Sequence, residues 1–134
     1  MPRRSLHCAV AIHKDLVVFG GDDDGDLVED YAVFNTEARS VAQGMQPRLL
    51  GNVPNVRRGS AAASAGKKII LFSGESTNEE EEPILMDDLY VIHMEDGKAL
   101  RFEKVEASGN YTPCPRKGAI LQEYAPGQLF LYGG

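Results

Sequence analysis

Basic residues recur in pairs along this chain, and this pattern is the strongest candidate for binding chemistry. Arg4, Arg57 and Arg116 each stand a similar distance before a short apolar run that ends in glycine. Each of the three has a second basic neighbour, and these neighbours are Arg3, Arg58 and Lys117. Because a guanidinium group binds a carboxylate through two parallel hydrogen bonds, a repeated row of arginines can hold an acidic peptide.

Acidic residues gather in two runs, "DDDGDLVED" (22–30) and "ESTNEEEEPILMDD" (75–88), which contain no basic residue. The net charge is −6, and the rest of the chain is mildly basic. An acidic total without a basic stripe argues against a nucleic-acid partner. Two interpretations stay open for the charges. The basic pairs form a binding rim together with Asp22, Asp23 and Asp24, or each arginine pairs with the acidic run of its own or a neighbouring repeat.

Residue types that often carry catalysis or metals are present but are not arranged for either. The histidines, His7, His13 and His93, lie in different predicted strands and show no metal-ligand spacing. The "GDDDGDL" segment departs from the EF-hand pattern, and no serine stands in a nucleophile elbow. Cys8 and Cys114 are expected to be free thiols. The sequence predicts no catalytic site, no metal and no cofactor.

Three similar apolar runs predict strands that close on glycine. They read "LVVFGG" (16–21), "IILFSG" (69–74) and "LFLYGG" (129–134). Four or five β-branched, aliphatic or aromatic residues bounded by glycine are typical of a buried strand. No segment shows a sustained helical period, and no apolar stretch is long enough to cross a membrane as a helix.

Further strands follow each apolar run at corresponding places. "EDYAVFN" (29–35) aligns with "DDLYVIH" (87–93), so that Asp30 stands opposite Asp88 in the alignment. More polar segments at 39–43 and 101–105 are predicted to be edge strands. The pattern predicts about ten strands in an internal repeat, with four strands in each complete copy.

At these residues the sequence resembles the kelch repeat. The double glycine of that family is matched by Gly20-Gly21, by Gly133-Gly134, and by Gly74 with Ser73 in the first position. The segment Asp88-Leu89-Tyr90-Val91 matches the third strand of the family. The tryptophan of the fourth strand is missing, and Phe102 and Val41 are expected to take its place. The resemblance covers essentially the entire chain.

The resemblance implies an all-β fold, a partial kelch-type β-propeller with four-stranded antiparallel blades. It implies a single kelch region over 1–134, divided into repeats at 2–53 and 54–112 and the first half of a third at 113–134. A blade buries its faces only against neighbouring blades. We therefore expect a fragment of a larger propeller, or a chain that closes with copies of itself.

The resemblance also implies a function, which is a non-catalytic protein–protein interaction scaffold that uses the loop face of the propeller. The expected partner is another protein or peptide, in addition to the remaining blades or copies of the chain. Two alternatives are a structural subunit that completes a larger assembly and a fragment of a kelch-type oxidase, epimerase or lyase whose site lies elsewhere. The start of the chain lacks the long apolar region of a secretory signal, so a cytoplasmic location is expected, with no nucleic-acid or membrane partner.

Overall fold

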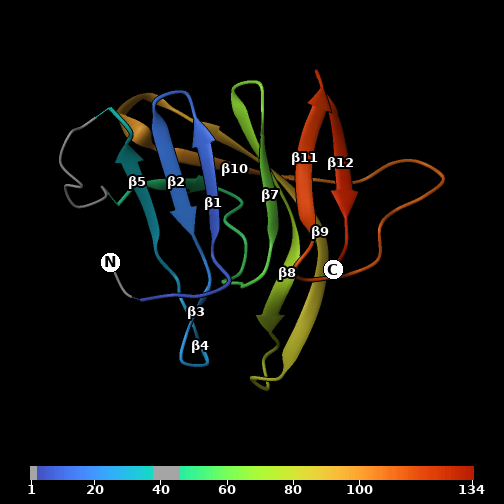
Figure 1. Ribbon diagram of the computed structural model, residues 1–134. Helices are drawn as coiled ribbons and strands as arrows, with labels where there is room; N and C mark the ends of the chain where they lie inside the picture. Colours follow the sequence, from blue (N-terminus) through green and yellow to red (C-terminus); the bar gives the residue numbers. More distant parts are fainter. Residues whose placement is uncertain (1–2, 38–45) are drawn as a thin grey trace.

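The fold is described by a computed structural model that covers residues 3–37 and 46–134. The described residues form twelve strands in four sheets and one short 3-10 helix (Figure 1). The elements are β1 (Cys8–Ile12), β2 (Asp15–Phe19), β3 (Asp22–Asp23), β4 (Asp26–Leu27), β5 (Tyr31–Asn35), β6 (Leu49–Gly51), β7 (Ala61–Ala65), β8 (Lys68–Thr77), β9 (Pro83–Met94), η1 (Asp96–Lys98), β10 (Leu100–Val105), β11 (Ile120–Ala125) and β12 (Gln128–Tyr132).

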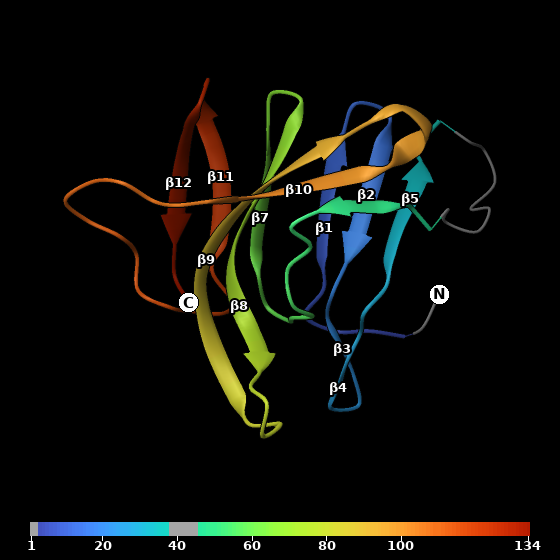
Figure 2. The same ribbon diagram turned by 180° about the vertical axis from the view of Figure 1, so that it is seen from behind.

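Three of the sheets stand side by side. The first has the order β1-β2-β5, the middle one β6-β10-β9-β8-β7, and the third is the hairpin β11-β12. β7 contacts both β1 and β11, so the leading strands of the three sheets line up across the molecule (Figure 1). Figure 2, the view from behind, shows β9 and β10 in front of this row. The fold is all-β, as predicted, and is a partial kelch-type propeller in which β7 to β10 form an antiparallel blade.

Glycine ends the second strand because the backbone of the following repeat comes very close there. Gly20 has a φ of 65°, and a Cβ atom at this position would lie 2.5 Å from the Arg57 carbonyl oxygen. The next residue, Gly21, donates its N–H to the same carbonyl at 3.0 Å. Ser73 takes the equivalent place with a φ of 59°, and its hydroxyl donates to the Arg116 carbonyl at 2.7 Å. The double-glycine position is therefore a contact between repeats.

The hydrophobic core lies between the first and the middle sheets. The Tyr31 ring stacks on Phe19 with centroids 5.5 Å apart and meets Phe102 edge-on at 5.4 Å. Phe102 is almost completely buried, which fits its expected role in place of the missing tryptophan. The buried residues of this core cluster are Cys8, Val10, Ile12, Val17, Phe19, Val33, Ile69, Leu71, Tyr90, Ile92, Leu100 and Phe102.

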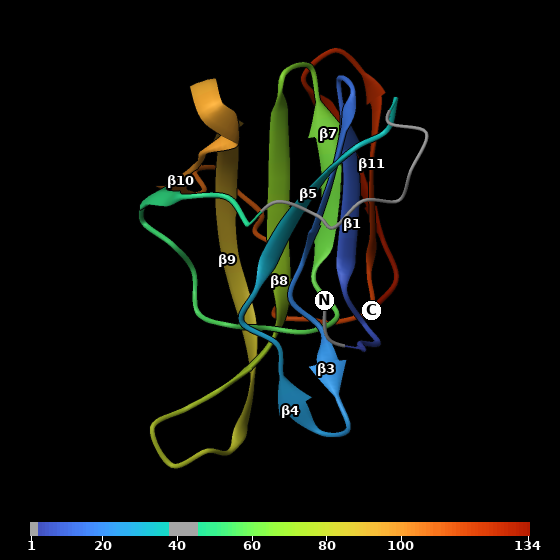
Figure 3. The ribbon, with the colours of Figure 1, turned by 90° about the vertical axis from the view of Figure 1, so that its left-hand side faces the viewer.

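The structure differs from the expected strands at three places. The acidic run 22–30 contains a small hairpin, β3–β4, and β8 and β9 continue past the glycine so that their hairpin projects from the sheet (Figure 3). β6 was not predicted, and it pairs in parallel with β10. The predicted strand 101–105 is part of β10, whereas the predicted strand 39–43, with Val41, lies outside the described residues.

Candidate functional site

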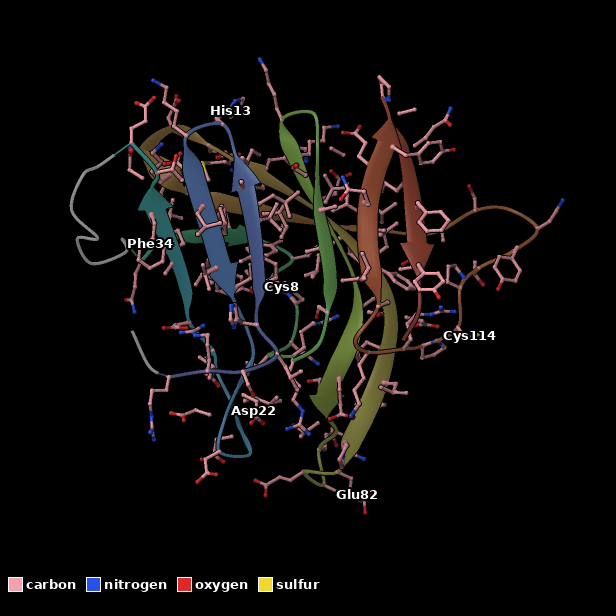
Figure 4. All side chains as sticks on the ribbon, in the orientation of Figure 1. Cys8, His13, Asp22, Phe34, Glu82 and Cys114 are labelled. Carbon is pink, nitrogen blue, oxygen red and sulfur yellow. The ribbon has the colours of Figure 1, made fainter. Side chains whose placement is uncertain are left out.

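Both acidic runs lie at one end of the molecule. The β3–β4 hairpin and the tip of the β8–β9 hairpin extend to the same side in every view (Figures 1 to 3). Figure 4 shows Asp22 and Glu82 at this end and His13 at the opposite end. We call this the hairpin end and define it by residues 22–30 and 75–88. The starts of the leading strands, with their basic pairs, also reach it.

Arg57 is buried at the hairpin end and is fully occupied by its own repeat. Its side chain is 4% exposed, and it donates to Asp88 through two hydrogen bonds of 2.5 and 3.0 Å. A third bond, of 3.0 Å, reaches the Ser73 carbonyl, and the guanidinium carbon lies 5.7 Å from the centroid of the Tyr90 ring. The arginine therefore joins the bulge of β8 at Ser73 to the start of the third-strand motif. Breaking a buried pair of this kind leaves an uncompensated charge.

The other two arginines make matching contacts. Arg4 is also enclosed, pairs with Asp30, and donates to the Gly20 carbonyl at 3.1 Å. Arg116 donates to the Gly133 carbonyl at 3.0 Å. In all three repeats the arginine thus holds the residue in the first position of the double-glycine motif. The aspartates of the motif, Asp30 and Asp88, serve as carboxylate partners for the first two arginines.

A second charge network crosses the boundaries between repeats. Arg58 pairs with Asp22 from the preceding repeat and with Glu75 from its own, and the Arg58 Nε–Glu75 bond is 2.8 Å. Lys117 of the third repeat then pairs with Glu75. Lys117 first and Arg58 second hold the pKa of Glu75 below its usual value, while burial opposes them. The Gly25 N–H and Arg58 likewise lower the pKa of Asp22. These ion pairs tie neighbouring sheets together.

The acidic side chains farther out at the hairpin end are open to solvent. Asn78 accepts the N–H groups of Glu80 and Glu82, both at 2.9 Å, and this fixes the turn that presents the glutamates. Within residues 3–37 and 46–134, nine acidic residues at this end form no ion pair. They are Asp23, Asp24, Asp26, Glu29, Glu79, Glu80, Glu81, Glu82 and Asp87.

A cavity of about 510 Å³ opens between the first and the middle sheets close to these acids. Its walls come from the end of β2, the segment after β4, the segment before β7 and the end of β8. The apolar residues of the lining include Phe19, Leu27, Val28, Tyr31, Val53, Val56 and Leu71. Apolar concave sites of this size are the usual form of a site for a side chain or a small ligand.

The predicted binding residues fall into two groups. Arg4, Arg57, Arg58 and Asp22 are engaged in ion pairs inside the protein, which is the arrangement that the second sequence interpretation describes. Lys117 is exposed and pairs with Glu75, whereas Arg116, Asp23 and Asp24 form no ion pair within the described residues and reach solvent to differing degrees. Their binding role stays a prediction.

Sequence reasoning missed Glu75 and the apolar segment 53–56 as parts of this region. Glu75 directly follows Ser73-Gly74, as Asp22 directly follows Gly20-Gly21, and this shared position was the available signal. Over the described part of the chain, no group of three or more His, Cys, Asp or Glu residues is placed to hold a metal ion. The described residues also contain no helix long and apolar enough to cross a membrane.

Known proteins resemble this chain over nearly its whole length. It is 38% identical over 133 residues to the dynein alpha chain of the flagellar outer arm from Chlamydomonas reinhardtii, which covers 98% of this chain and 3% of that protein. It is 27% identical over 132 residues to the host cell factor homolog hcf-1 from Caenorhabditis elegans, covering 98% of this chain and 16% of that protein. Human host cell factor 1 is 28% identical over 135 residues, covering all of this chain and 6% of that protein.

The chain therefore spans only a small part of the length of each of these relatives. A family model described as the KLHDC2/KLHL20/DRC7 Kelch-repeats domain matches residues 1–134. The match spans all three glycine-ended strands, and it confirms the resemblance seen in the sequence. The chain belongs to this kelch-repeat family.

Proposed function

We propose that the chain is a non-catalytic protein–protein interaction module whose contact surface is the hairpin end. The observation that carries the proposal is the set of acidic side chains that form no ion pair within the described residues and lie near an open, partly apolar cavity. The inner ion pairs and sheets hold both hairpins in fixed positions, and a preorganised surface binds with a smaller loss of conformational entropy. Similar regions in a dynein chain and in host cell factors support a role as one module within a larger protein.

The proposal includes the repeat division at 2–53, 54–112 and 113–134, because Gly20, Ser73 and Gly133 make equivalent contacts with arginines. It also includes the cytoplasmic location and the absence of a nucleic-acid or membrane partner. Its partners are another protein or peptide and the surrounding blades, whether these come from a longer chain or from copies of this one.

Quantitative affinity purification with matched charge variants tests the proposed surface. One variant carries Asp26→Lys and Glu80→Lys at the hairpin end, and the control carries Asp96→Lys and Glu103→Lys, which change the formal charge equally elsewhere. We expect a set of proteins that the wild type and the control retain but the hairpin variant loses. Equal recovery by both variants would show that the hairpin end is not the contact surface.

A second candidate function, a structural subunit that completes a larger assembly, is favoured by one face of the third sheet. Ile120, Tyr124, Phe130 and Tyr132 are each more than half exposed on β11 and β12, and Phe130 stacks with Tyr132 at 6.3 Å. A continuous apolar face is typical of a surface that another sheet covers. Light scattering of the wild type and of a Phe130→Glu variant tests this role. A wild-type oligomer that the variant dissociates supports it, and identical monomers contradict it.

A further inference from the structure

The cavity at the hairpin end, of about 510 Å³, is large enough to admit an apolar side chain, and its lining contains both apolar and polar residues. The rings of Phe19 and Tyr31 and the side chain of Leu71 line its inner part. Val53, which is 41% exposed, and the exposed Thr77 lie among the lining residues nearer to solvent. The buried residues belong to the sheets, so the walls are preformed. An apolar side chain that enters this space exchanges contact with water for contact with carbon.

Charge determines which kind of chain segment can carry that side chain into the cavity. Two charged residues line the cavity, Arg57 and Glu29. Arg57 is neutralised by its two hydrogen bonds to Asp88, whereas Glu29 is exposed and forms no ion pair in the described part of the chain. Because Asp88 offsets the charge of Arg57, the charge of the lining that remains uncompensated is the carboxylate of Glu29.

The two hairpins extend this negative charge on both sides of the cavity. The β3–β4 hairpin contributes Asp23, Asp24 and Asp26, and the tip of β8–β9 contributes the glutamates at 79–82. The hairpins leave the first and the middle sheets respectively, and both sheets also line the cavity (Figure 3). Side chains that flank an anchored residue on both sides would therefore meet carboxylates. Opposite charges at the rim steer association and select the partner.

We propose that this cavity binds an apolar side chain from a basic segment of a partner protein, with lysine or arginine residues on either side of the anchor. The proposal rests on the proposed function and names the partner class for the same surface. It differs from the acidic peptide that the repeated arginines suggest in the sequence. An acidic segment in this cavity would have to displace Asp88 from the enclosed Arg57, at an end of the molecule with nine carboxylates that form no ion pair within the described residues.

Selection from a display library of random twelve-residue peptides tests the proposal without a presumed ligand. The wild-type protein is the bait, and enriched peptides are synthesised and measured by fluorescence anisotropy. Thr77→Trp fills the mouth of the cavity, and Gln128→Trp is the matched control because it adds the same side chain at an exposed strand position on the third sheet. Asp26→Lys with Glu80→Lys reverses the charge of both hairpins.

We expect enriched peptides with a net positive charge and at least one large apolar residue. Their dissociation constants should rise at least tenfold in Thr77→Trp and in the charge variant, and should change less than twofold in Gln128→Trp. Binding should also weaken as salt increases, because exposed charges are screened. Circular dichroism of each variant shows whether the sheet is retained.

Enrichment of acidic peptides would overturn the proposal, as would the absence of any enrichment or equal binding by Thr77→Trp and the wild type. Each of these three results leaves the proposed function intact if the recovery of partner proteins in affinity purification still depends on Asp26 and Glu80. If that dependence is absent while basic peptides bind in the cavity, the proposed contact surface fails and the cavity site remains.

Discussion

The chain contains two junctions between neighbouring sheets, and equivalent polar contacts form at both. We call the contact of the β1-β2-β5 sheet with the middle sheet the first junction, and the contact of the middle sheet with β11-β12 the second. In the first, Gly21 donates its N–H to the Arg57 carbonyl at 3.0 Å, and in the second Gly74 donates to the Arg116 carbonyl at 2.9 Å. Each junction also has an ion pair at equivalent positions, Asp22–Arg58 or Glu75–Lys117, and the first junction has a further pair, Asp15–Lys98.

The junctions differ in how much apolar surface they bury. The first junction encloses Phe19 at 2% exposure, covered by the stacked Tyr31 from the third strand of its sheet. At the second junction, Leu121, Leu129 and Leu131 remain partly exposed and line a cavity of about 380 Å³. The polar contacts therefore form without a third strand in the outer sheet, whereas the buried core needs that strand. The polar contacts set the register between neighbouring repeats, and the third strand provides the apolar burial between them.

The largest expected effect comes from equivalent aromatic residues in these different surroundings. Phe19 is buried at the first junction, and its repeat equivalent Tyr132 is 67% exposed. Phe19→Ala should lower the free energy of unfolding by about 3–5 kcal/mol, because it removes a large buried side chain and leaves a cavity. Tyr132→Ala should change it by less than about 0.5 kcal/mol. Urea denaturation followed by circular dichroism measures both, and similar losses would contradict the comparison.

A smaller effect is expected where the polar contact requires glycine. Gly20→Ala should lower the free energy of unfolding by roughly 2–4 kcal/mol, since it combines a left-handed backbone with a collision against the Arg57 carbonyl. Gly66→Ala is the control, because Gly66 has a similar φ of 60° but nothing within 4 Å of the added methyl group. Its cost should be about 1 kcal/mol. Equal costs in the same denaturation assay would mean that the close approach does not matter.

The sequence allowed the repeat to be predicted because its signals are local. A short apolar strand that ends at Gly20-Gly21 has the same pattern in each copy, and the family match confirms it. β6 could not be predicted in this way, since Leu49–Gly51 is too short to show a period and its partner β10 lies far along the chain. The β3–β4 hairpin was hidden because acidic residues favour loops, while its ends are held by a bridge between Asp22 and Ser5.

The charges of the site could be found from sequence, but their partners could not. The row of Arg4, Arg57 and Arg116 was correctly recognised as a repeat, yet one pattern fits both a binding rim and internal ion pairs. The choice depends on which carboxylates come within reach after folding, and Asp88 reaches Arg57 from 31 positions away. The cavity was also beyond sequence reasoning, because its lining comes from several separate segments.

A third prediction concerns Glu75, which joins the two junctions through Arg58 and Lys117. Its pKa is lowered in the folded state, so it contributes stability above its usual pKa of 4.5, and this contribution is lost as the pH falls through the folded value. Glu75→Gln should therefore lower the free energy of unfolding by about 1 kcal/mol at pH 7. The difference from the wild type should shrink below pH 4.5, in urea denaturation series at several pH values.

Glu103→Gln is the control for this series, because Glu103 is an exposed carboxylate outside the network. It should leave the free energy of unfolding nearly unchanged at pH 7. A Glu75→Gln difference that stays constant from pH 7 to pH 3 would show that the carboxylate charge is not what stabilises the junctions.

The smallest expected effect uses the two cysteines as reporters of burial. Cys8 lies in the core of the first junction and donates its thiol to the Ser60 carbonyl at 3.0 Å, while Cys114 is exposed before the third sheet. Burial raises the pKa of Cys8 to about 12, so at pH 8 only about one thiol in ten thousand is ionised. Because the thiolate is the reactive form, a thiol reagent should label Cys114 quickly and Cys8 only after the junction opens.

The Cys114→Ser background isolates the slow reaction of Cys8, and the labelling rate then measures how often the first junction opens. Phe19→Ala should raise this rate, since it weakens the core around the thiol, whereas Tyr132→Ala should leave it unchanged. Equally fast labelling of Cys8 and Cys114 in the wild type would mean that the first junction does not protect the Cys8 thiol. A labelling rate that increases with Phe19→Ala alone would show what keeps the first junction closed. It would be the apolar core that Tyr31 of the third strand covers, and not the polar contacts that form at both junctions.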